Sequence, residues 1–347
     1  MGAASKRAPF SARFALVLLL AAVVPASIVI ALRSSGPAAV VPPTQLGGQF
    51  DQQLFVALGT EVRAIEVRPL ANDDARFLLR RSRDVSAALI AMLPENVSYT
   101  IINGGTLRQA SNMFGIYHHE IAKLNPTLEL DQPLAPGTKI VVHRRVPGLL
   151  SRSIGSASAG SLENAVPMLE GPGRILRTNR YKSWATDTTI AHLDWVFNEW
   201  ARRFSEYPPL LVGNLSIRKG GRNPPHQSHQ SGRDVDLCYV ELNPPPGPPS
   251  WKVFDASNFD PKGNWAMLRL LEETKAVQVM LVDYELQKLL YDYALANQVM
   301  SNKELAHWLQ YPDGPKVSDR LVRHGPGHAD HIHVRFLCTA HDTACVH

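Results

Sequence analysis

The sequence predicts an α+β protein whose C-terminal half is built around a mostly antiparallel sheet. Two periodicities support this prediction. Apolar residues recur at helical spacing between positions 187 and 204, which indicates an amphipathic helix with one face toward a core. Polar and apolar residues alternate between positions 331 and 336, which indicates a strand that buries every second side chain. The other predicted elements of this half are strands at 210–212, 235–240 and 277–282 and helices at 265–271 and 285–294.

The N-terminus has the residue order of an export signal. Three basic residues precede an uncharged stretch that runs from position 14 to position 32. A stretch of roughly nineteen residues is long for a signal peptide and sufficient for a membrane-spanning helix. We therefore predict that residues 1–33 are an uncleaved membrane anchor with its N-terminus inside, and a cleaved signal peptide is the alternative. Both interpretations place the rest of the chain in the periplasm or another extracytoplasmic compartment.

Three segments outside the predicted domains carry no motif. Residues 34–48 are rich in proline, glycine and alanine, which is typical of a spacer. Residues 49–96 alternate apolar and charged positions, and we assign them no function. Residues 145–165 are predicted to be a linker, because serine, glycine and alanine dominate their centre.

Residues 97–144 are predicted to form a small βααβ module. A strand ends in the turn at 103–105, Thr106 can cap a helix, and Gly137 turns the chain into a second strand. The segment resembles a LysM repeat, and this resemblance implies binding of the N-acetylglucosamine-containing glycan of peptidoglycan. Gly105 stands where that family usually has aspartate. Packing of the module against the C-terminal domain is therefore the alternative to glycan binding.

The C-terminal domain, residues 166–347, contains residue types that bind zinc. His229 is followed by Asp236, and His331 and His333 flank a single isoleucine. Zinc binds imidazole nitrogen and carboxylate oxygen, and a catalytic zinc site needs three such ligands and one open position. On a strand the two histidines of the second motif point to the same face, so one can bind the metal while the other faces the bound water. The sequence therefore predicts a catalytic Zn²⁺ site.

The spacings H-x6-D and H-x-H resemble those of the penicillin-insensitive murein endopeptidases, over roughly residues 170 to 347. The segment 240–264 does not match the positions at which that family can hold a second metal, so we predict one zinc ion. The resemblance implies the metal ligands His229, Asp236 and His333 and the catalytic residues His331, His328 and His226.

The same resemblance implies a disulfide between Cys338 and Cys345, which an oxidising compartment would permit. Cys238 remains, two positions after Asp236. We predict that it is a small buried hydrophobic residue of the same strand, because the predicted ligand set is complete without it.

The resemblance implies that zinc-activated water hydrolyses the D-alanyl to meso-diaminopimelyl cross-links of peptidoglycan. His331 could take the proton of that water or stabilise the oxyanion, and His328 or His226 could contact the other oxygen or protonate the leaving amine. Arg233 and Arg335 could bind substrate carboxylates or form structural ion pairs with a neighbouring aspartate. The alternatives are a zinc D,D-carboxypeptidase that trims stem peptides and a non-catalytic peptidoglycan-binding regulator.

Composition and missing motifs argue against other classes of protein. The chain has a net charge of +5 and a calculated pI near 9.1, which suits an anionic polymer as partner. No basic run is interleaved with aromatic residues, so we predict no nucleic-acid binding. Neither G-x-S-x-G nor S-x-x-K can be placed, which argues against a serine acyl-enzyme. The implied enzyme should therefore resist β-lactams.

Overall fold

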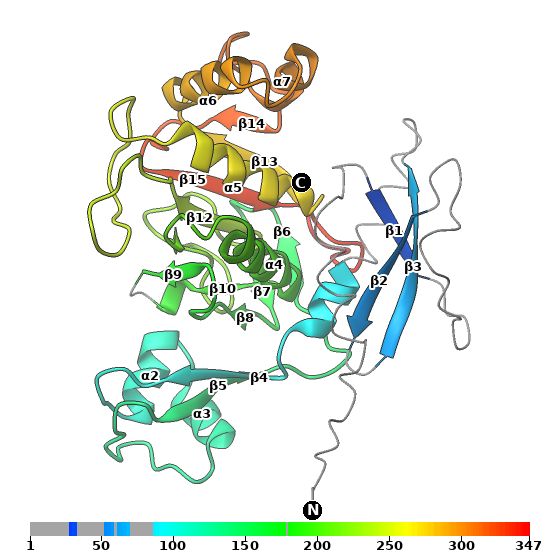
Figure 1. The fold of residues 1–347 in the computed structure, drawn as a ribbon. Helices are drawn as coiled ribbons and strands as arrows, with labels where there is room; N and C mark the ends of the chain where they lie inside the picture. Colours follow the sequence, from blue (N-terminus) through cyan, green and yellow to red (C-terminus); the bar gives the residue numbers. More distant parts are fainter. Residues whose placement is uncertain (1–27, 33–51, 59–60, 70–85, 178–179) are drawn as a thin grey trace, which may run out of the picture. The chain divides into compact units, whose positions relative to one another are not determined.

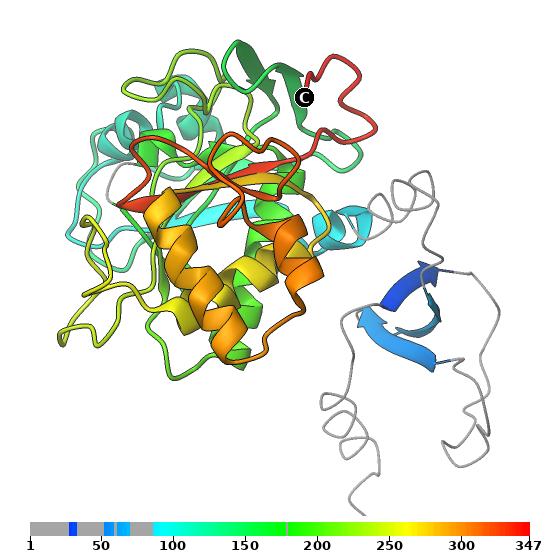
Figure 2. The same cartoon turned by 90° about the horizontal axis from the view of Figure 1, so that it is seen from above.

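The chain divides into two compact units, Met1–Asp84 and Val85–His347, and each is described here by itself. Figures 1 and 2 give two views of the elements. The computed structural model describes residues 28–32, 52–58, 61–69, 86–177 and 180–347.

The described part of the N-terminal unit is an antiparallel sheet of β1 (Ile28–Leu32), β2 (Gln52–Leu58) and β3 (Glu61–Pro69), with β3 in the middle. The predicted membrane segment lies outside the described residues as far as position 27. Residues 28–32 of this segment form β1 rather than part of a helix, because the β-branched run there pairs with β3. Within the described ranges, no helix is both long and apolar enough to cross a membrane.

The second unit begins with the predicted βααβ arrangement. It consists of β4 (Asn96–Thr100), α2 (Leu107–Phe114), α3 (His118–Leu124) and β5 (Lys139–Arg144), with β4 and β5 antiparallel. The hydroxyl of Thr106 accepts a hydrogen bond from the backbone of the first turn of α2, as predicted. The order of elements is confirmed, whereas the kinship with LysM repeats remains a prediction.

This module packs against the C-terminal domain. The indole of Trp184 donates a hydrogen bond to the carbonyl of Phe114 at the end of α2 (2.8 Å). The next residue, Gly115, has φ of 67° and lies against the ring of Tyr181, which occupies the space that a Cβ would need. Arg218 and Glu120 form an ion pair across the same contact. The predicted packing of the module on the C-terminal domain is therefore present, while glycan binding remains a prediction.

The predicted linker at 145–165 is wrong for its second half. Residues there form a hairpin of β6 (Arg152–Gly155) and β7 (Gly160–Glu163). The backbone N–H of Ser153 donates to Asp342 (2.8 Å), and that of Gly155 donates to the carbonyl of Ala344 (2.8 Å). These bonds tie the hairpin to the C-terminal segment. Small residues permit such close backbone contact, so their abundance here reflects packing rather than flexibility.

The core of the second unit is a six-stranded sheet in the order β14-β13-β15-β12-β11-β9. β15 pairs antiparallel with β12 and β13, and β11 pairs antiparallel with β12. At the two edges, β9 pairs in parallel with β11 and β14 pairs in parallel with β13. The prediction of a mostly antiparallel sheet is confirmed. The strands are β9 (Arg174–Leu176), β11 (Leu210–Val212), β12 (Asp234–Cys238), β13 (Val277–Val282), β14 (Val322–His324) and β15 (His331–Phe336), while β8 (Val166–Pro167) and β10 (Trp184–Ala185) form a separate pair.

The helices predicted from periodicity are α4, α5 and α6. Thr186 caps α4, and Asp260 caps α5, whose first residue is a proline that fits a helix start. α4 packs on α5 and α5 on α6, while Figures 1 and 2 show α6 beside α7, which was not predicted. The bounds are η2 (Arg180–Lys182), α4 (Asp187–Arg203), α5 (Pro261–Glu273), α6 (Tyr284–Ala296) and α7 (Asn302–Trp308).

The alternation along β12 and β15 gives the two faces of the sheet opposite character. The apolar side chains of β15, Phe336 among them, are at most 1 % exposed. His192 of α4 stacks on Phe336 with 6.2 Å between ring centroids, so α4 covers this apolar face. The other face of the same two strands carries the acidic side chains of β12 and the histidines of β15.

Stability of this core should depend on the protonation of His192. Burial lowers the pKa of His192 to about 4, from an ordinary value of 6.5. The unfolded chain therefore binds the proton more readily, and the free energy of unfolding should fall as the pH drops from 6.5 towards 4. We expect His192→Phe to remove on the order of 2 kcal/mol of this pH dependence, measured by chemical denaturation at about pH 7 and about pH 4.5.

His307→Phe is the matched control, because His307 is exposed on α7. It should leave the pH dependence of stability unchanged. An equal slope in the wild type and in His192→Phe would contradict the prediction.

Candidate metal centre

The register of the two central strands brings the predicted ligands together. Asp236 of β12 lies directly opposite His333 of β15. His229 belongs to the loop that enters β12, and its imidazole reaches the same point. All three residues are buried, at 1 to 3 % exposure. The pairing of β12 with β15 therefore brings the predicted ligands together from positions about a hundred residues apart.

Three ligand atoms form a nearly equilateral triangle. The distances are 3.1 Å from His229 Nε2 to Asp236 Oδ1, 3.1 Å from His333 Nδ1 to Asp236 Oδ1, and 3.1 Å between the two nitrogens. A tetrahedral zinc ion with bonds of about 2.0–2.1 Å needs ligand atoms roughly 3.3 Å apart. The donor types and their separations thus fit a zinc ion bound on one side of the triangle, with a fourth position left for another ligand.

The orientation of His229 is fixed from two sides. Its Nδ1 donates to the carbonyl of Leu215 (3.0 Å), so the lone pair of the neutral ring lies on Nε2, the atom in the triangle. Its backbone has φ of 63°, an uncommon conformation for a residue other than glycine. The backbone N–H donates to Asp234 Oδ2 (2.8 Å), which holds this conformation. The loop therefore directs Nε2, which carries the lone pair when the ring is neutral, at the predicted ligand set.

Asp234 also supports the opposite ligand. Its Oδ1 lies 3.4 Å from His333 Nε2 and accepts a hydrogen bond from Arg335 Nε (2.7 Å). His333 Nε2 is buried and makes no well-formed hydrogen bond of its own. A carboxylate on the far side of a ligating imidazole is a common arrangement in metal sites, because it orients the ring and makes it a stronger ligand. Sequence analysis did not identify this role of Asp234.

The cluster attracts positive charge. Burial alone would raise the pKa of Asp236, but the imidazoles of His229 and His333 outweigh it and hold that pKa well below its usual range. Burial alone would lower the pKa of His333, but Asp234 and Asp236 outweigh it and raise that pKa to about 9. A proton and a metal ion therefore compete for the same place.

His226 also lies at the cluster. Its Nδ1 is 3.7 Å from Asp236 Oδ2, and His226, His229 and Asp236 form a group whose ligand atoms all lie within 4.8 Å of one another and could hold a metal ion. Its other ring nitrogen lies 2.7 Å from Asn214 Nδ2, which donates to it. Burial, followed by the nearby His229, lowers the pKa of His226 to about 4. The ring is thus neutral at pH 7.

The two remaining predicted residues converge on the same point. His331 Nε2 lies 3.6 Å from Asp236 Oδ1, and the ring of His328 packs on that of His331 with centroids 4.8 Å apart. His331 Nδ1 donates to Asp330, a residue that sequence analysis missed. The position of Asp330 directly before the H-x-H motif was the feature of the sequence that could have identified it. All six predicted residues are therefore brought together by the fold.

The two arginines left open by the sequence are structural. Arg335 is paired with Asp234, as described above. Arg233 is buried and donates to the carbonyls of Phe336 (2.8 Å) and Val346 (2.9 Å). Both guanidinium groups are therefore held by groups of the protein itself.

The cysteines behave as predicted. Cys338 and Cys345 form a disulfide, and Cys238 is buried at 2 % exposure. Burial raises the pKa of the Cys238 thiol to about 12, so the thiol is neutral and unreactive.

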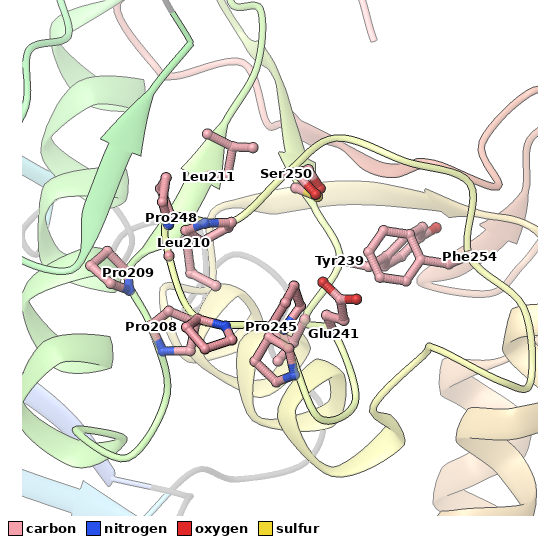
Figure 3. A pocket seen from close by; sticks show the side chains of 16 residues that line it. Pro208, Pro209, Leu210, Leu211, Tyr239, Glu241, Pro245, Pro248, Ser250 and Phe254 are labelled. Atoms are coloured by element: carbon pink, nitrogen blue, oxygen red, sulfur yellow. The ribbon is translucent and has the colours of Figure 1, made fainter.

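A pocket of about 230 Å³ lies beside β12, and none of the six predicted residues lines it. Figure 3 shows its wall of prolines, from Pro208 and Pro209 on one side and from the exposed loop at 244–249 on the other. Ser250 and Cys238 also line it. The loop that forms this wall leads directly to Trp251, whose indole lies 5.4 Å from the ring of His331.

The fold and the cluster define the class of the protein. A buried carboxylate among imidazoles, on the face of the sheet opposite α4, is the kind of centre that metal-dependent hydrolases use. Residues 153–347, more than half of the chain, match the family model of the penicillin-insensitive murein endopeptidases, and the chain belongs to this family. It is therefore a peptidase that acts on murein. No curated protein matches the sequence significantly.

Removal of the charge of Asp234 should weaken zinc binding without removing a ligand. In Asp234→Asn the amide oxygen can still accept the backbone hydrogen bond of His229, but His333 loses the carboxylate at its Nε2. We expect zinc affinity to fall by about 10-fold to 100-fold. A competition titration against a chromophoric chelator measures this.

Asp330→Asn is the matched control, because it also converts a carboxylate beside a histidine, here His331, into an amide. It should leave zinc affinity unchanged. An equal loss of affinity in both variants would show that Asp234 has no special role at the ligands.

Proposed function

We propose that the chain is a zinc-dependent murein endopeptidase that hydrolyses the D-alanyl to meso-diaminopimelyl cross-link of peptidoglycan. Membership of the family supports the substrate class. The observation that carries the zinc dependence is the triangle of ligand atoms, 3.1 Å on each side, in which the Nδ1–H of His229 is bound by the Leu215 carbonyl and Nε2 faces the other two atoms. Three such atoms at these distances are better suited to bind one shared cation than to form hydrogen bonds with one another.

His229, Asp236 and His333 would hold the ion. Zinc bound there would supply a Lewis acid for the peptide carbonyl and lower the pKa of a water molecule toward about 7. We assign His226 a supporting role rather than that of a ligand. Because Asn214 donates to its Nε2, the proton of the neutral ring is on Nδ1, which faces Asp236 Oδ2.

His331 is the proposed general base. Its Nδ1 donates to Asp330, so the lone pair of the neutral ring is on Nε2, on the side of the ligand set. It can take a proton from the attacking water at Nε2 and give it to the leaving amine. His328 Nδ1 donates to the carbonyl of Gly325 (3.1 Å), which leaves its Nε2 as an acceptor. His328 is therefore suited to accept a hydrogen bond from the water or the amine.

Mass spectrometry of muropeptides tests the proposed reaction. We expect the purified chain with zinc to convert cross-linked dimers into monomers, and EDTA or His229→Ala to abolish the conversion. His331→Ala should retain zinc and lose about 100-fold to 10,000-fold in rate, as expected for removal of a general base. Release of free D-alanine from uncrosslinked stems would instead identify a carboxypeptidase. Bound zinc without any product would identify a non-catalytic protein.

We also propose that the chain works outside the cytoplasm, with association to the membrane through its N-terminal segment. Two observations support this. Basic residues precede an uncharged stretch at the start of the sequence, and the Cys338–Cys345 disulfide suits an oxidising compartment.

We propose further that the βααβ module binds the glycan strand of peptidoglycan. Its packing on the peptidase domain leaves Ile102, at the turn after β4, 60 % exposed. Exposed apolar side chains of this kind can pack on sugar rings. We expect Ile102→Glu to weaken binding of an N-acetylglucosamine tetramer to the whole chain by about tenfold, measured by calorimetry.

Leu149→Glu is the control, because Leu149 is similarly exposed, at 53 %, but lies outside the module. Its binding should equal that of the wild type. Absence of binding to the wild type, or equal losses in both variants, would refute the glycan proposal.

A further inference from the structure

One cationic side chain beside the metal centre remains uncommitted. Arg177 follows β9 directly and is exposed. Its guanidinium stacks on the indole of Trp251, with 4.6 Å from Cζ to the ring centroid. The backbone of Arg177 is hydrogen-bonded to Val212 and Arg180, but its guanidinium has no hydrogen-bond or ion-pair partner within residues 86–177 and 180–347. The neighbouring Lys182 differs, because its Nζ donates to the carbonyl of Pro224.

The indole under Arg177 is held in a fixed place. Trp251 Nε1 donates to Asp330 Oδ2 (3.0 Å), and the ring lies 5.4 Å from that of His331. The ring also fills the space above Gly213. A Cβ at position 213 would lie 2.6 Å from the indole and 3.1 Å from the Cβ of Asp236. Trp251 is thus part of the wall of the metal centre.

Asp330 connects this wall to the proposed base. One of its oxygens accepts from Trp251 and the other from His331. Both oxygens of Asp330 therefore already accept a hydrogen bond, and Asp330 forms no ion pair with Arg177. Stacking fixes the plane of the guanidinium but leaves its N–H groups free. Two parallel N–H groups of a guanidinium can donate to the two oxygens of one carboxylate.

We propose that Arg177, stacked on Trp251, forms a subsite that binds a free carboxylate of the stem peptide next to the scissile bond. This inference rests on the proposed function. An extended peptide advances about 3.3–3.6 Å per residue, so a carboxylate within two or three residues of the scissile carbonyl can reach across the indole and His331. Arg233 and Arg335, the other arginines considered for this task, are occupied within the protein.

The test measures binding separately from hydrolysis. The ligands are two cross-linked stem-peptide dimers, in which the diaminopimelyl carboxylate beside the cross-link is either free or converted to a carboxamide. Calorimetry on the whole chain carrying His331→Ala, with zinc, gives both affinities. We expect the free acid to bind about 10-fold to 100-fold more tightly than the amide. Arg177→Gln should abolish this preference, and Arg177→Lys should retain part of it.

Arg222→Gln is the matched control, because it removes one positive charge from another exposed position of the same domain. It should leave the preference for the acid intact. Equal losses in Arg177→Gln and Arg222→Gln would indicate general attraction of charges and would overturn the subsite. Equal binding of acid and amide to the parent chain would overturn it as well.

Hydrolysis by the chain with His331 intact separates this inference from the proposed function. Arg177→Gln should raise KM for the acid with little change in kcat, because the contact is the same in the bound substrate and in the transition state. A preference for the acid without any hydrolysis would support the subsite and refute the proposed reaction. Hydrolysis of acid and amide with equal kcat/KM, unaffected by Arg177→Gln, would support the proposed reaction and refute the subsite.

Discussion

The pairing of β12 with β15 is the constraint on which the rest of the structure depends. It sets Asp236 opposite His333, and the alternation of side chains then separates a buried apolar face from the face that carries the centre. A slip of one residue would exchange the two faces of a strand. It would turn Ile332 and Val334 toward the centre and drive two histidines into the core under α4. Burial of the apolar residues of these strands fixes the register, and the register fixes where the proposed ligands lie.

Burial of charge at the centre is possible because each charge has a partner. An isolated carboxylate in an apolar environment is very unfavourable. Asp236 lies among imidazoles, and Asp234 is bound by Arg335 and by the backbone of His229. The positive φ of His229 is local strain that this second aspartate offsets. The centre is thus held in shape by groups that do not themselves belong to the proposed ligand set.

Periodicity predicted the elements that bury one face, and the two motifs predicted which residues lie near one another. The strand at 331–336 and helix α4 follow from alternation and helical spacing, and the six candidate residues lie close together in the fold. The hairpin β6-β7 was missed because its small residues carry no period, and its strands are held by bonds to Asp342 and Ala344, nearly two hundred positions away. The roles of Asp234 and Arg233 could not be predicted for the same reason, because their partners are distant in the sequence and come near only in the folded chain.

The βααβ module is connected to the ligands through a short chain of contacts. Phe114 of the module accepts a hydrogen bond from Trp184, whose backbone forms an isolated β-bridge with Ser216. The residue before Ser216 is Leu215, and its carbonyl fixes the tautomer of His229. The loop that supplies this ligand is thus held on one side by the sheet and on the other by Trp184. Because interiors are densely packed and transmit strain, loss of the module contact would loosen the backbone that orients the ligand. Trp184 is thus shared between the contact with the module and the backbone that orients His229.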